Sequence, residues 1–149
     1  MSNDYESVRI EDELGFPLYA CSKELIRRYT PVLDKIGLTY TQYIAMMILW
    51  DVKEIKVKDL GERLFLDSGT LTPLLKKLEA KGYLERIRNK DDERNVTIKI
   101  TKEGEALEEK AGIVPEEIKR FINLSPVEAN VLYELLYKLL YNLSEGENE

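Results

Sequence analysis

Small, hydroxylated side chains followed by lysines stand together soon after Asp67. The residues of this group are Ser68, Gly69, Thr70, Thr72, Lys76 and Lys77. Short side chains at the start of a helix let its backbone approach the floor of a DNA major groove, where hydroxyl groups can hydrogen-bond to base edges. Lysines about one turn later can reach backbone phosphates. Taken alone, the small residues are better explained as helix caps.

A second group of charged residues follows, and it favours a DNA contact over simple capping. Its members are Arg86, Arg88, Lys90, Asp92 and Arg94. An arginine at a hairpin tip can enter a narrow minor groove, where the negative potential is strongest. Asp92 could hold the Arg94 guanidinium through a charge-assisted pair. A solvated charged loop is the alternative, and it weighs most for Lys90. Beside such a hairpin, a DNA contact is the better interpretation of the hydroxylated helix start.

The elements around these groups follow from hydrophobic periodicity and capping signals. Thr39 and Gln42 form a capping box, Asp67 or Ser68 caps the proposed reading helix, and Gly82 stops it. Three short helices are predicted, over residues 39–50, 57–64 and 68–81. Residues 83–88 and 96–100 alternate with period two around the polar stretch 89–95, which predicts a β-hairpin with a long charged tip.

Longer helices flank this core. Residues 10–36 carry two apolar stripes, so we expect other apolar surfaces to pack against this helix on two sides. Pro31 is expected to kink the helix or end it early. Thr101 caps a helix that is interrupted near Pro115, and a capping box at Ser125 opens the last one. The fold class is therefore mainly α with a small β-hairpin wing. We expect one domain over 1–149, with a winged helix-turn-helix at about 39–102 and dimerisation helices at about 10–36 and 105–143.

Composition narrows the function. The 149 residues include no histidine, so Ser–His, Cys–His and His–metal sites are excluded. No glycine-rich phosphate loop follows a strand-like stretch. We expect neither an enzyme nor a cofactor nor a bound metal.

The net charge of −6 is unevenly distributed. Residues 56–102 hold 12 Lys and Arg against 8 Asp and Glu, a balance of +4, whereas the remainder holds 10 against 20, a balance of −10. Phosphate binding needs only a local basic surface, so the middle of the chain is where we expect DNA. A single cysteine and the lack of an apolar signal segment in residues 1–6 favour the cytoplasm.

Two segments resemble the MarR family of dimeric bacterial regulators. They are Asp92-Glu93-Arg94 followed by Ile100-Thr101-Lys102-Glu103-Gly104, and residues 64–79, which are most similar to the OhrR/SarZ branch that senses organic hydroperoxides. The resemblance covers about residues 14–104 and, more loosely, the last two helices. It implies a triangular homodimer with a winged module at each lower corner. The positions that match those used on DNA are Ser68, Thr70, Lys76, Arg86, Asp92 and Arg94.

That branch senses peroxide with a cysteine near the start of the first helix. Two tyrosines of the partner subunit hydrogen-bond to that cysteine. Tyr29 and Tyr40 match those tyrosines, with Tyr19 nearby, but the cysteine position is Gly15. Cys21 is about 9 Å further along a helix and rotated by about 240°, so it points to another face. Its place on an apolar stripe favours inert packing. Peroxide sensing and a small phenolic or apolar effector near the tyrosines both remain open.

The sequence therefore predicts a homodimeric transcriptional regulator, a repressor by our interpretation, that binds a pseudo-palindromic operator in double-stranded DNA. The alternative is a winged-helix module that binds proteins and has lost DNA binding. Such a module would carry an acidic or apolar reading helix, whereas this one keeps Lys76 and Lys77.

Overall fold

The computed structural model describes residues 7–145, except for the side chains of Glu93 and Arg94. The elements, in chain order, are η1 (Ile10–Asp12), α1 (Gly15–Asp34), α2 (Tyr40–Val52), β1 (Glu54–Lys56), α3 (Val57–Leu64), α4 (Ser68–Ala80), β2 (Leu84–Asn89), β3 (Asp92–Ile100), α5 (Lys102–Ala111), α6 (Ile113–Ile122) and α7 (Pro126–Glu145). The chain divides into two compact units, one ending at Glu117 and the other beginning at Ile118. Residues 1–6, which bear on the question of a signal segment, lie outside the described residues.

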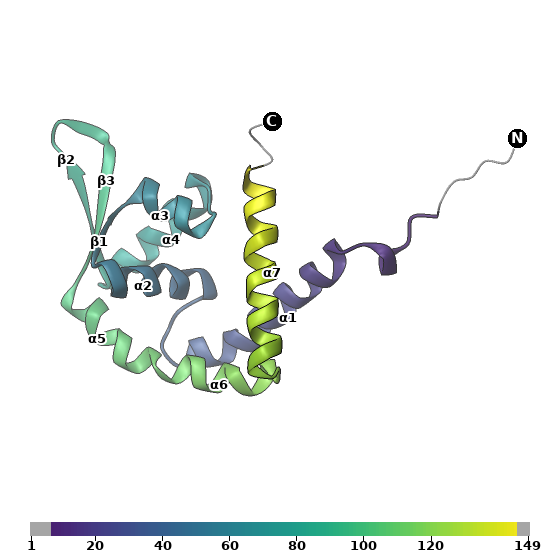
Figure 1. Ribbon diagram of the computed structural model, residues 1–149. Coiled ribbons are helices and arrows are strands. Elements are labelled where there is room, and N and C mark those ends of the chain that lie inside the picture. The colour runs from purple at the N-terminus through teal and green to yellow at the C-terminus, as the bar shows by residue number, and fades with distance from the viewer. Residues whose placement is uncertain (1–6, 146–149) are drawn as a thin grey trace, which may run out of the picture. The chain divides into compact units, whose positions relative to one another are not determined.

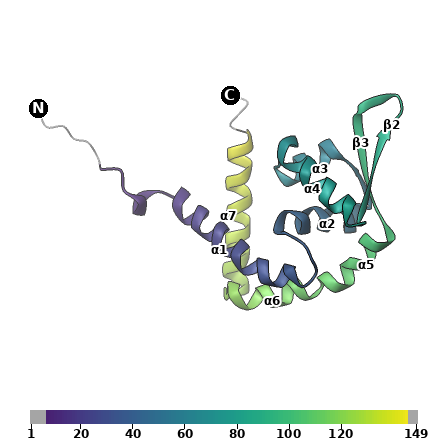
Figure 2. The same cartoon turned by 180° about the vertical axis from the view of Figure 1, so that it is seen from behind.

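The winged module forms within the first unit. Figures 1 and 2 show α3 and α4 next to each other above α2, with the β2–β3 hairpin at one end. The mainly helical fold with a β-hairpin wing, predicted above, is confirmed. No helix in the described part of the chain is long and apolar enough to cross a membrane.

Local capping explains where several helices begin. At α2 the Gln42 N–H donates to Thr39 Oγ1 at 3.3 Å, and the Thr39 N–H donates to Gln42 Oε1 at 3.1 Å. The same reciprocal pair joins Ser125 and Glu128 ahead of α7. Thr101 caps α5 by accepting from the Gly104 N–H at 3.0 Å. Each pair satisfies backbone donors that a helix leaves unpaired, so these predicted starts are confirmed.

The sheet differs from the predicted simple hairpin. Its order is β1-β3-β2, and β1 pairs antiparallel with β3, with Ile55 opposite Ile98. No strand is predicted from sequence between the helices at 39–50 and 57–64, because three strand residues show no usable periodicity. Their strand conformation comes from pairing with a segment more than forty positions away.

The hairpin tip is short, so the predicted long charged tip is wrong. Only Lys90 and Asp91 form the turn, and β3 already begins at Asp92. The Asn89 side chain accepts from the Asp91 N–H at 3.3 Å, a local bond that favours a tight turn. Asp92 pairs with Asn89, and the register then shifts so that Arg88 pairs with Val96, which leaves residues 93–95 of β3 without a partner in β2.

The first and sixth helices also depart from expectation. Residues 10–12 form a separate 3-10 turn, because Glu13 is extended, and α1 then runs three residues past Pro31. The break between α5 and α6 falls at Gly112 and not near Pro115. Pro115 is the third residue of α6, a position whose N–H has no partner inside a helix, so proline costs little there.

The core of the first unit joins the end of α1 to the winged module. Its most deeply buried side chains are Leu33, Met46, Leu49, Leu60, Leu71, Leu75, Leu78, Leu84, Ile98 and Val114. Trp50 closes one side, where its indole N–H donates to the Gly104 carbonyl at 2.8 Å. This packing fixes α4 and the hairpin on a common support.

Candidate nucleic-acid interface

The reading helix α4 presents two different faces. Leu71, Leu74, Leu75 and Leu78 are buried at the three- and four-residue spacing of one helical face. The residues proposed for DNA lie mainly on the other side: Ser68, Gly69, Thr70, Lys76 and Lys77 are exposed, and Thr72 is half-buried at the edge. Burial of the leucines therefore orients small and basic side chains towards solvent together.

Asp67 holds the start of α4. Its carboxylate accepts from the Thr70 N–H at 2.7 Å. Hydrogen bonds from the Thr70 side chain, and then from its backbone, lower the pKa of Asp67 below its usual range. The first turn is thus ordered without a large side chain, which keeps the helix end accessible to a groove.

The wing carries the other proposed residues, and the structure divides them. Arg88, Lys90 and Asp92 are exposed along β2 and the start of β3. Strand alternation places Arg86 on the same side as the buried Leu84. The side chain of Arg94 lies outside the described residues, so its proposed minor-groove role stays a prediction from sequence.

Arg86 is already engaged within the module. Its Nε lies 3.3 Å from Glu79 Oε1, and its backbone N–H donates to Glu79 Oε2 at 3.0 Å. The Arg86 side chain is only 23% exposed. In this arrangement Arg86 fixes β2 against α4, a role that sequence reasoning missed because Glu79 carries no motif of its own.

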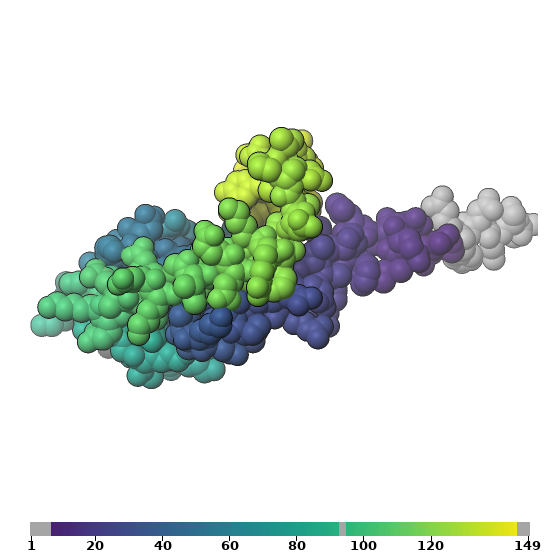
Figure 3. All heavy atoms as spheres, turned by 90° about the horizontal axis from the view of Figure 1, so that it is seen from below, coloured from purple at the N-terminus to yellow at the C-terminus, as the bar shows by residue number. Residues whose placement is uncertain are grey.

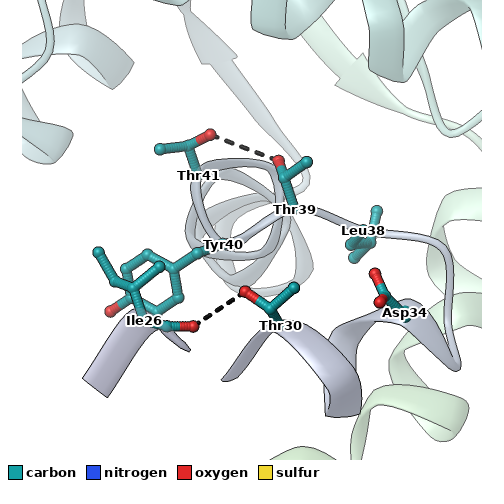
Figure 4. Close-up of a pocket in the computed structure, with 7 residues that line it drawn as sticks. All are labelled: Ile26, Thr30, Asp34, Leu38, Thr39, Tyr40 and Thr41. Atoms are coloured by element: carbon teal, nitrogen blue, oxygen red, sulfur yellow. Dashed lines mark hydrogen bonds between the residues drawn. The ribbon is translucent and has the colours of Figure 1, made fainter. Parts of the chain in front are cut away.

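The proposed sensor residues fall into two places. Tyr40 lines a pocket of about 310 Å³ together with Ile26, Thr30, Asp34, Leu38, Thr39 and Thr41. Figure 4 shows these residues on the second half of α1, on the turn that follows it and at the start of α2. Tyr29 does not line the pocket, but its ring centroid lies 4.9 Å from that of Tyr40. Burial is the main reason that the pKa of each of these two phenols is raised.

The remaining sensor positions, Gly15, Tyr19 and Cys21, lie on the first half of α1 and away from this pocket. Figure 3 shows that half of the helix as a narrow projection from the winged module. Cys21 is exposed in the single chain, so no contact within this chain buries it, and its inert packing stays a prediction. The apolar stripe that suggested burial is itself uncovered here, as the exposure of Leu14 and Tyr19 indicates.

Comparisons with known proteins place this architecture. The model of the transcriptional regulator SarA/Rot family matches residues 27–110. The organic hydroperoxide resistance transcriptional regulator of Bacillus subtilis is 42% identical over 97% of this chain and 99% of its own. The regulator SarZ of Staphylococcus epidermidis is 43% identical over 87% of each chain. A MarR variant from E. coli, solved with operator DNA, superimposes with a TM-score of 0.76 at 28% identity, covering 85% of this chain and 93% of that one.

These proteins are transcriptional regulators and not enzymes. The family matches the helices and the wing that carry the candidate interface, and the relatives extend the match across both compact units. The resemblance first seen in the wing and the reading helix is thereby confirmed. The chain belongs to the SarA/Rot family of transcriptional regulators, which has the MarR-like winged-helix fold.

Proposed function

We propose that this protein acts as a homodimer, in the cytoplasm, and represses transcription by binding a pseudo-palindromic operator. The observation that carries the proposal is the two-faced helix α4. Its leucine face is buried, and its other face presents Ser68, Thr70 and Lys76 beside an exposed wing. Small residues at a helix start suit base edges in the major groove, and lysines suit phosphates.

Uncovered apolar surface supports a dimer. Large apolar side chains are exposed on the first half of α1, and separately along α7 from Val127 to Leu143. Exposed apolar surface of this extent marks an interaction site. A second copy would supply a second α4, and two such helices about 34–36 Å apart would enter successive major grooves.

A binding experiment tests the proposal. A duplex is first selected by the protein from random-sequence DNA, and its dissociation constant is then measured at several salt concentrations. We expect affinity to fall steeply with salt, with Lys76→Ala lowering the slope by about 0.9 if that lysine meets one phosphate. Lys99→Ala is the control, because Lys99 is an exposed lysine of the sheet outside the interface. Failure to select any duplex would favour the protein-binding alternative.

The role of the wing in DNA binding is tested with a separate substitution. Arg94→Ala should weaken binding of the same duplex while leaving the oligomeric state, measured by sedimentation, unchanged. An unaltered dissociation constant would exclude Arg94 from the interface.

Control by hydroperoxide is tested by restoring the missing thiol. The Bacillus subtilis relative is named for organic hydroperoxide resistance, whereas Gly15 stands at the sensing position of this chain. No atom outside its own helix turn lies within 4 Å of a Cβ added there, so Gly15→Cys should fold. In a Cys21→Ser background, release of the duplex by cumene hydroperoxide would indicate that the remaining sensing apparatus is intact. No release would point to control by another effector.

A further inference from the structure

The C-terminal end of α4 is tied to the turn that joins α1 to α2. Lys81 follows the last helical residue, and its Nζ donates to the Gly37 carbonyl and, at 3.3 Å, to Gln42 Oε1. Gly37 occupies this turn with φ +72°. Both acceptors are neutral, so the lysine is held by hydrogen bonds and not by an opposite charge.

Gln42 makes this tie rigid. It is only 4% exposed, and its Oε1 also accepts the Thr39 N–H of the α2 capping box. One oxygen therefore receives the cap of α2 and the end of α4. Buried polar groups joined in this way are costly to rearrange, because breaking one bond leaves another group unsatisfied.

A second tie holds the other side of the same helix end. Glu79 accepts from the backbone N–H and the guanidinium of Arg86 in β2. The reading helix is thus anchored by side chains at its C-terminal end, towards α2 through Lys81 and towards the wing through Glu79. At its N-terminal end, where Ser68 and Thr70 lie, the Asp67 cap is the side-chain hydrogen bond that the described residues show.

We propose that Lys81 is a positioning residue for DNA recognition, which sets the direction of α4 by fixing its end to the α1–α2 turn. The inference rests on the proposed DNA-binding function. Thirteen residues make α4 about 20 Å long, so a tilt of about 5° at Lys81 displaces the reading end by between 1 and 2 Å. A displacement of that size breaks hydrogen bonds to base edges, whose donor–acceptor range is narrower.

The experiment separates positioning from a direct phosphate contact. Lys81→Met, Lys81→Arg and the control Lys99→Met are measured against the selected duplex and a scrambled duplex, across a salt series. We expect Lys81→Met to bind the selected duplex about tenfold more weakly, with an unchanged salt slope and unchanged affinity for the scrambled duplex. Lys81→Arg, which can still donate to the turn, should recover most of that loss, and Lys99→Met should match the original protein.

Three results would overturn the inference. The first is that Lys81→Met binds like the original protein. The second is that it loses affinity for both duplexes with a salt slope smaller by about 0.9, which identifies a phosphate contact. The third is that the original protein binds neither duplex specifically. That result overturns the proposed DNA-binding function itself, and it is seen before any substitution is compared.

A double-variant cycle tests the pathway through Gln42. If Lys81 acts through this residue, Gln42→Leu and Lys81→Met together should weaken specific binding no more than the stronger single variant. Additive losses would mean that Lys81 acts independently, contrary to the proposal. Melting temperatures recorded for every variant identify any loss that follows from partial unfolding, and Lys81→Met, at an exposed position, provides the decisive comparison if Gln42→Leu does not fold.

Discussion

Leucines of the winged module and leucines of α7 have opposite environments. Leu78 on α4 is 0% exposed, whereas Leu135 on α7 is 58% exposed, and none of the described residues of α7 is buried. The winged module therefore derives its stability from contacts within one chain. The apolar surface of α7 can be removed from water only by contact with another surface, which the proposed dimer would supply.

The same contrast exists inside α1. Val32 and Leu33 near its end are buried against the module, but Leu14 is 66% exposed in its first half. The C-terminal end of α1 thus packs into the core, whereas its N-terminal half is exposed. This division explains why an apolar stripe by itself did not reveal that Cys21 is exposed.

Truncating a leucine in each region gives the largest expected contrast. Leu78→Ala should lower the free energy of unfolding by about 2–5 kcal/mol, because it removes buried contacts and leaves a cavity. Leu135→Ala should change the stability of the isolated chain little, because its side chain is already exposed. Urea unfolding at low protein concentration measures both. Equal losses would contradict the division into core and interface.

Adding a charge to α7 tests what covers that helix. Leu135→Glu should convert dimers to monomers in sedimentation experiments and weaken binding of a two-half-site duplex by about 100-fold, because the second half-site loses its tether. Lys138→Glu, in the same helix but outside the leucine stripe, is the matched control. A dimer that survives Leu135→Glu would place the interface elsewhere.

Two glycines probe how tightly each region is packed. A Cβ on Gly104 would collide with the Tyr83 carbonyl and lie 2.8 Å from Ile100 Cγ1, whereas one on Gly15 meets nothing within 4 Å. Gly104→Ala should therefore cost about 1–3 kcal/mol of unfolding free energy through overpacking. Gly15→Ala should be neutral or slightly stabilising. Thermal melts of the two variants compare them directly, and a neutral Gly104→Ala would refute the close packing.

The smallest effect concerns the cap of α4 and its dependence on pH. Hydrogen bonds from Thr70 lower the pKa of Asp67 in the folded chain, so its contribution is complete above the ordinary value of 3.8 and is lost as pH falls through the lowered one. Asp67→Asn keeps a capping oxygen but cannot titrate. The stability difference between the two proteins, from urea unfolding at pH 7 and pH 3, should shift in favour of the asparagine at pH 3. Identical pH dependence would exclude this titration.

Local chemistry made much of the fold predictable. The caps of α2, α4, α5 and α7 each join residues three positions apart, so both partners of each bond stand within one short stretch of sequence. The α4 leucines repeat with helical spacing, and the face left for DNA follows from that spacing alone. The helix that carries the candidate site was accordingly identified with nearly its observed bounds.

Long-range partners decided the rest. β1 is a strand only because β3 lies beside it, and Arg86 is occupied because folding brings Glu79 to it. Lys81 meets Gly37 and Gln42 from about forty residues away. The sequence by itself determined which segments are helical and which of their faces are apolar, since those depend on near neighbours. The tertiary structure alone decided which apolar faces are covered and which charges are already paired, because burial and pairing depend on what the fold brings close.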